Sequence, residues 1–123
     1  MKPHKSQSLH ESFKYAWEGI RHTFIHERNF KIHVICAILT IIICIVLPVD
    51  TLHRFMVIYA IFFVLCMELI NTAAESLVDL HCGKNLSPLA KVVKDCCAGA
   101  VLLASIQAII VAIIVAIHIL SRL

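Results

Sequence analysis

Residues Phe55 to Asp79 read FMVIYAIFFVLCMELINTAAESLVD and combine an apolar half with a polar half. Its first thirteen residues, 55–67, are uninterruptedly apolar, whereas the next twelve contain three carboxylates and an amide. At 100° per residue, Glu68, Asn71, Glu75 and Asp79 fall within an arc of about 80° on one helix face. A charge near the centre of a bilayer costs about 3 kcal/mol, so an acidic residue there indicates a functional site.

The composition of the whole chain predicts an integral membrane protein. The 123 residues are 60% hydrophobic and have a mean hydropathy of +0.89, above the roughly half apolar content of soluble domains. We expect a single all-α domain over residues 1–123. The net charge of +3 is too small to indicate nucleic-acid binding. Residues 1–31 lack the early apolar segment of a signal peptide, so the first span is expected to direct insertion.

The N-terminal segment predicts an amphipathic helix over residues 8–28. Ser8 and Glu11 match a capping box, and Leu9, Phe13 and Trp17 follow at helical spacing. This helix either lies on the membrane surface, with Trp17 at headgroup level, or packs on protein alone. Both interpretations stay open.

Three spans are expected at about 30–47, 55–80 and 88–120. Pro48 ends the first, and Asp50 or Thr51 is placed to cap the second. Ser87 followed by Pro88 is a strong helix start.

The six cysteines show no C-x-x-C spacing, and we expect them to act as packing residues. His22 and His26 have the i, i+4 spacing of a metal pair, but a solvated helix face is the simpler interpretation.

The basic residues predict the orientation. Six Lys or Arg precede the first span, one lies in the first loop, three surround the second loop and one ends the chain. Cytoplasmic segments carry the excess of positive charge. The N-terminus and the loop at Gly83 are therefore expected in the cytoplasm, with the C-terminus outside.

Carboxylates on two segments, a lysine and a lipid-facing helix are the parts of a phosphoryl-transfer site. Such transfer needs a cation bridging the phosphates, positive charge and a base for the hydroxyl proton. Glu27 and Glu75 suit Mg²⁺ shared with ATP, Lys94 suits a phosphate, and the deeper Glu68 suits the base. The chain has neither a Walker A loop nor a G-x-G-x-x-G motif, so a soluble kinase fold is excluded.

The same residues resemble a known family. Glu68-x-x-Asn71-Thr72-Ala73-x-Glu75-x-x-x-Asp79 and Ala90-x-x-x-Lys94-Asp95 are similar to the signature of the prokaryotic diacylglycerol kinases. Tyr15-x-Trp17-x-Gly19-x-Arg21 and Glu27-x-x-Phe30 fit as well.

The resemblance implies a small lipid kinase of the bacterial plasma membrane. Such a kinase has three spans and a surface helix, and it works as a homotrimer whose active sites a neighbouring subunit completes. It further implies that the active site faces the cytoplasm, that ATP and Mg²⁺ bind there, and that a membrane lipid alcohol is the acceptor. By the resemblance, Glu68 is the base and Asn71 orients the reactants. Glu27 and Glu75 bind Mg²⁺ and nucleotide, and the other nucleotide contacts are Tyr15, Lys94 and Asp95. Trp17 and Glu68 contact the lipid.

Two positions depart from the pattern of the proteobacterial enzymes, and they bear on the identity of the lipid acceptor. His33 stands where the proteobacterial enzymes tend to carry a glutamate, and an arginine expected near Ser8 is missing. The pattern is more similar to the Gram-positive branch, which implies undecaprenol as acceptor and undecaprenyl phosphate as product. The alternative is a diacylglycerol kinase that makes phosphatidic acid. Both acceptors present one hydroxyl at the interface, so physical reasoning leaves the choice open.

Other classes of function compete with catalysis. In a non-catalytic membrane protein the polar face would join helices, or simply mark the cytoplasmic end of a span, which explains Asp79 better than Glu68. A pore would repeat its polar face along the whole span, but residues 55–67 are apolar. A proton relay would need neither Lys94 and Asp95 nor Glu27.

Overall fold

The computed structural model describes residue 5 and residues 8–123, which form four α-helices and contain no strand. They are α1 (Leu9–His26), α2 (Arg28–Val46), α3 (Thr51–Cys82) and α4 (Pro88–Arg122). The last three are long and apolar enough to cross a membrane. The predicted all-α membrane architecture is confirmed.

Side-chain caps set three of the helix starts. The Ser8 hydroxyl accepts a hydrogen bond from the Glu11 N–H (3.2 Å), and Ser87 accepts one from the Ala90 N–H (3.2 Å). Asp50 rather than Thr51 caps α3, through the His53 N–H at 2.9 Å. This cap starts α3 at Thr51, four residues before the predicted span. Gly83, with φ of 58°, ends α3, because this left-handed conformation costs other residues more.

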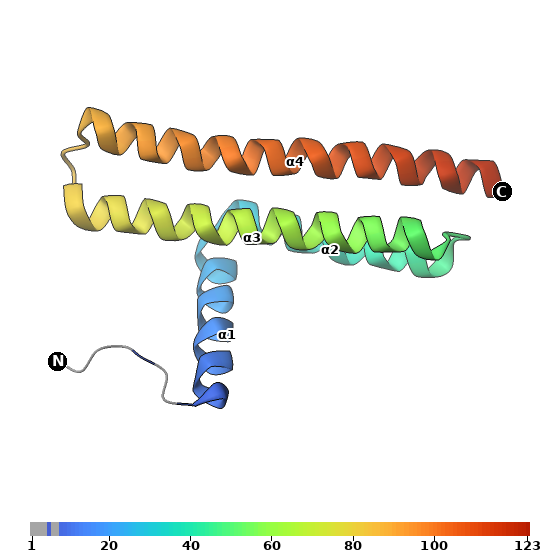
Figure 1. The fold of residues 1–123 in the computed structure, drawn as a ribbon, viewed down its shortest axis with the longest axis horizontal. Coiled ribbons are helices and arrows are strands. Elements are labelled where there is room, and N and C mark those ends of the chain that lie inside the picture. Colours follow the sequence, from blue (N-terminus) through green and yellow to red (C-terminus); the bar gives the residue numbers. More distant parts are fainter. Residues whose placement is uncertain (1–4, 6–7) are drawn as a thin grey trace.

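A single extended residue separates α1 from α2. Glu27 has φ −106° and ψ 112°, and its N–H donates to the Thr23 carbonyl at 2.8 Å. The sequence predicts a surface helix over 8–28 and a first span from about 30, and the structure places the break between them slightly earlier, at Glu27. Because the chain turns here, α1 runs across the direction of α2, α3 and α4, which lie side by side (Figure 1).

Helix length places the polar ends outside the apolar layer. At 1.5 Å per residue, α3 and α4 are about 48 Å and 52 Å long, against a hydrocarbon core of about 30 Å. The last turns of α3 and the first turns of α4 extend past the level at which α1 meets the bundle (Figure 1). Leu9, Phe13 and Trp17 are exposed on α1, as expected of a helix lying on a membrane surface.

The compact core lies towards the other end of the bundle. It comprises Cys44, Val49, Val57, Ala60, Val111, Val115 and Ile119. Nearer the middle, α2, α3 and α4 leave an apolar groove of about 270 Å³ between them. The lining of this groove includes the polar side chains of His33, Thr40 and Ser105.

Candidate active site

Glu68 is the buried carboxylate of the structure. Only 4% of the residue is exposed, because α3 turns it towards α2. Its Oε1 lies 3.3 Å from Nε2 of His33, which is within ion-pair distance. The two atoms are not aligned for a hydrogen bond, and Oε1 has no hydrogen-bond partner among the described residues. A carboxylate is costly to bury without full pairing, so this position indicates a reactive group better than a structural one.

Two more predicted site carboxylates lie on the elements around Glu68. Glu27 is at the junction of α1 and α2, and Glu75 lies about two turns further along α3. The Glu27 side chain makes no capping hydrogen bond to α2, so its oxygens are available to a ligand. That Glu27 acts together with the polar face of α3 remains a prediction.

Asn71 connects the deep and shallow parts of this face. Its Nδ2 donates to Oε1 of Glu75 at 3.4 Å, one helical turn along α3. Its buried Oδ1 has no hydrogen-bond partner among the described residues. Glu68 and Asn71 therefore each present an unsatisfied oxygen, and buried polar groups in folded proteins are seldom left so.

Lys94 joins α4 to the end of α3. Its Nζ donates to Oδ1 of Asp79 at 2.7 Å, where the Asp79 side chain is 62% exposed. The structure thus pairs the lysine predicted to hold a phosphate with a carboxylate. Asp95 pairs with Lys91 at 2.5 Å on an exposed surface of α4. Of the predicted nucleotide contacts, Lys94 is thus paired across two helices, whereas Asp95 is paired within its own helix.

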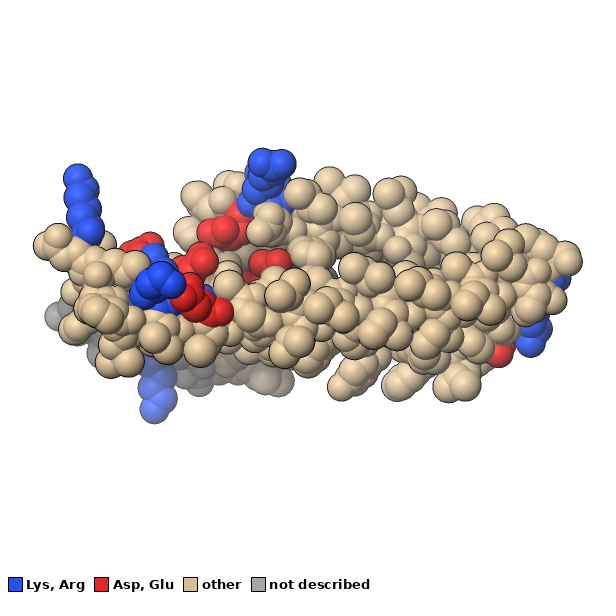
Figure 2. Space-filling model, turned by 90° about the horizontal axis from the view of Figure 1, so that it is seen from above, with Lys and Arg blue, Asp and Glu red and all other residues tan. Residues whose placement is uncertain are grey.

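The remaining predicted contacts lie on α1. Tyr15 is partly buried and Trp17 is exposed, both on the helix that runs away from the bundle at its junction with α2 (Figure 1). Figure 2 shows acidic side chains gathered in a hollow towards one end of the molecule, with Lys and Arg near them. Between this hollow and the opposite end, that face carries neither acidic nor basic side chains. The polar site is therefore confined to one end.

The oxygen donors fit a magnesium ion. Mg²⁺ prefers carboxylate oxygens, water and substrate phosphates, and the cluster offers the carboxylates of Glu27 and Glu75. The side-chain oxygen of Asn71 supplies a further polar atom without a partner. No sulfur ligand is needed, and the residues present suit a hard cation.

Two contacts at this site were not predicted. The sequence marks His33 as unusual, but its pairing with Glu68 depends on the rotation of α2 against α3, which no local pattern reports. The Lys94–Asp79 pair likewise depends on how α3 and α4 pack. A lone histidine beside an apolar run, in the second turn of α2, is the kind of signal that would direct attention to His33.

Comparisons with known proteins identify the family of this chain. The model of a family described as prokaryotic diacylglycerol kinase matches residues 14–116. A diacylglycerol kinase of Synechocystis is 43% identical over 81% of this chain and 57% of its own length. The chain thus spans little more than half of that relative.

Two other relatives are covered more fully. A diacylglycerol kinase of Escherichia coli K12 is 33% identical over 78% of each chain. An undecaprenol kinase of Bacillus subtilis is 33% identical over 85% of each chain. Because the family match covers most of the residues and includes the whole carboxylate face, the chain belongs to the prokaryotic diacylglycerol kinase family, a family of lipid kinases.

Proposed function

We propose that this chain transfers the γ-phosphoryl group of ATP, with Mg²⁺, to the hydroxyl of a membrane lipid. The observation that carries the proposal is the position of Glu68. It is buried beside His33, and His33 also lines the apolar groove between the spans. A lipid chain in this groove would bring its hydroxyl to the carboxylate from the membrane side.

Each polar residue has a role in this proposal. Glu68 accepts the proton of the lipid hydroxyl, and Asn71 orients the reacting groups. Glu27 and Glu75 hold Mg²⁺, which neutralises the phosphates and the charge that develops on them. Lys94 turns from Asp79 to a phosphate when nucleotide binds, and Tyr15 and Asp95 contact the nucleotide.

Trp17 is assigned to the lipid. On the exposed face of α1 it sits at headgroup level, where an indole has an apolar body and a polar N–H. It would help to position the acceptor beside the groove.

For the acceptor we propose undecaprenol, with undecaprenyl phosphate as product. The sequence pattern around His33 supports this choice, and a relative named undecaprenol kinase matches over most of its length. Diacylglycerol is the second candidate, because the Synechocystis and E. coli relatives are named for it.

We also propose that the enzyme works as a homotrimer with shared sites in the bacterial plasma membrane. A single chain leaves broad apolar faces on its spans exposed, with Ile45, Leu103 and Ile117 all more than half exposed. Its carboxylate cluster is also open on one side (Figure 2). A neighbouring subunit would cover part of these faces and close the site, with lipid covering the rest.

The decisive experiment is a transfer assay with purified protein in mixed micelles. Radiolabelled ATP and Mg²⁺ are supplied with undecaprenol or diacylglycerol in turn, at equal mole fraction. The proposal expects phosphorylated lipid with at least one acceptor and a higher kcat/KM with undecaprenol. A higher kcat/KM with diacylglycerol would overturn the acceptor assignment alone. Transfer to neither lipid, by protein of normal helicity, would favour a non-catalytic membrane role.

A further inference from the structure

A second polar cluster lies at the end of the bundle remote from the carboxylate hollow. It joins Asp50, which caps α3, His53 in the first turn of α3, and His118 near the end of α4. One ligand-type atom from each residue lies within 4.8 Å of the other two. None of the three belongs to the candidate active site.

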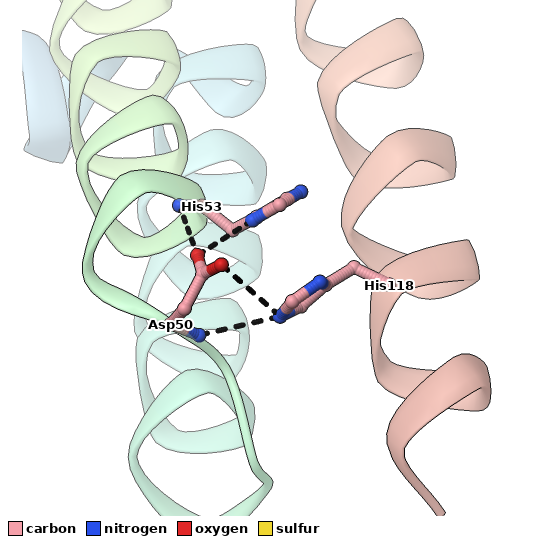
Figure 3. A group of neighbouring side chains, drawn as sticks. All are labelled: Asp50, His53 and His118. Carbon is pink, nitrogen blue, oxygen red and sulfur yellow. Dashed lines mark hydrogen bonds and ion pairs between the residues drawn. The ribbon is translucent and has the colours of Figure 1, made fainter.

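The three side chains face one another across the gap between α3 and α4 (Figure 3). Nδ1 of His53 lies 2.6 Å from Oδ1 of Asp50, and Nε2 of His118 lies 3.8 Å from Oδ2 of the same carboxylate. The imidazole rings stack, with centroids 3.8 Å apart and planes at 12°. Two helices distant in sequence thus present two nitrogens and one carboxylate at a single point.

The hydrogen bonds show which contacts a cation would replace. The Asp50 N–H donates to Nε2 of His118 at 3.3 Å, so this nitrogen carries a lone pair that a cation could take over by displacing that N–H. Oδ1 of Asp50 accepts the backbone N–H of His53 at 2.9 Å and also faces Nδ1 of the same residue. Oδ2 of Asp50 has only longer ion-pair contacts, to His118 and to Arg122 at 3.9 Å.

From this geometry we propose that Asp50, His53 and His118 form a binding site for Zn²⁺ or a similar first-row transition-metal ion. Two imidazole nitrogens and a carboxylate suit such an ion, whereas Mg²⁺ prefers oxygen ligands alone. Water fills the fourth position of a tetrahedral site, since all three side chains remain partly exposed.

Binding requires a small rearrangement. Metal–ligand bonds of about 2.0–2.2 Å place tetrahedral ligands about 3.3 Å apart, so the widest separation must contract by about 1.5 Å. One imidazole leaves the stack, because the in-plane lone pairs of parallel rings do not converge. The metal replaces the proton between His53 Nδ1 and Asp50 Oδ1, and that proton passes to Nε2 of the same ring or to solvent.

A bound metal would link the start of α3 to the end of α4. The cluster adjoins the core residues Val49, Val115 and Ile119, which pack near this end. A ligand that binds only the folded chain stabilises it. Metal binding should therefore raise the unfolding temperature of the protein in detergent.

The test uses full-length, untagged protein in detergent, stripped of metal with a chelator. Co²⁺ is titrated as a spectroscopic probe of the zinc site, and Zn²⁺ is then added to displace it. We expect one equivalent per chain with tetrahedral absorption, displaced by Zn²⁺ and unaffected by excess Mg²⁺. Absence of such binding in the wild-type protein would overturn the proposal.

Matched variants locate the site. H53Q and H118Q should each weaken Co²⁺ binding by about 10-fold or more, and D50N should do the same while it preserves the helix cap. H118C supplies a different zinc ligand and should retain Zn²⁺, which separates loss of a ligand from misfolding.

Two controls test the competing histidines. The α1 pair His22 and His26 has stacked rings 4.3 Å apart, and His33 adjoins the carboxylates. H22Q/H26Q and H33Q should bind like the wild type. Normal binding by H53Q and H118Q, or loss in either control, would place the metal elsewhere and overturn the assignment.

Discussion

At the scale of single residues, Glu68 separates a catalytic site from a polar helix contact. A scaffolding glutamate would be expected to make complete hydrogen bonds with its neighbours. Glu68 is instead buried against His33 with one oxygen lacking a hydrogen-bond partner among the described residues. That arrangement is consistent with a base awaiting a substrate proton.

Replacing Glu68 by glutamine tests this role. Glutamine keeps the shape of the side chain but cannot accept the hydroxyl proton as a carboxylate does. Base catalysis contributes about 10²–10⁴-fold, so E68Q should lower kcat by that order while ATP affinity stays near the wild-type value. Kinetics and nucleotide binding are measured beside E68A. Near-normal turnover in E68Q, together with an altered oligomeric state in E68A, would show that Glu68 is structural.

Glu75 allows a separate test of the metal. Its Oε1 accepts a hydrogen bond from the side-chain amide of Asn71. A glutamine at this position would keep the size of the side chain while removing the charge. E75Q should lose most transfer activity and require more Mg²⁺ for what remains, because a neutral amide binds a divalent cation poorly. E18Q makes the same chemical change at an exposed position of α1 and should behave as wild type. An unchanged Mg²⁺ dependence in E75Q would remove Glu75 from the metal site.

At the scale of the helices, sequence patterns predict where a helix starts better than they predict how the helices pack. Ser8 and Ser87 cap the helices that they were expected to cap, because capping depends on a few adjacent residues. The start of α3 at Thr51 follows from the Asp50 cap, one of the two local candidates in the sequence, whereas no local signal fixes the break at Glu27 to that residue. The helical period placed Glu68, Asn71 and Glu75 on one face of α3. It could not reveal that His33 or Lys94 would meet that face.

The cap of α4 offers a prediction at this scale. The Ser87 hydroxyl satisfies the Ala90 N–H at 3.2 Å, and its removal leaves a first-turn donor without its partner. S87A should cost about 1 kcal/mol of local stability, seen as faster amide exchange in the first turn of α4. S87N restores a capping oxygen and should exchange like wild type. Equal protection in S87A and wild type would mean that Pro88 and packing alone define this helix start.

At the scale of the whole molecule, the two ends of the bundle differ in chemistry. The loop between α3 and α4 lies at one end, beyond the level at which α1 meets the bundle (Figure 1), and the acidic side chains gather in a hollow towards the same end (Figure 2). The Asp50 cluster and the C-terminus lie at the other. An enzyme that uses ATP must present the first end to the cytoplasm, and the excess of Lys and Arg before the first span predicts the same orientation.

Cysteine labelling in intact cells tests this orientation. A cysteine added after Leu123, which is 79% exposed, should react with an impermeant thiol reagent from outside, above the level of the unmodified chain. N85C, in the exposed loop between α3 and α4, should react only after the cells are permeabilised. Both sites are at exposed positions, so a difference in labelling reports the side of the membrane. Labelling of N85C alone in intact cells would invert the topology and place the carboxylate site away from cytoplasmic ATP, which the proposed reaction does not allow.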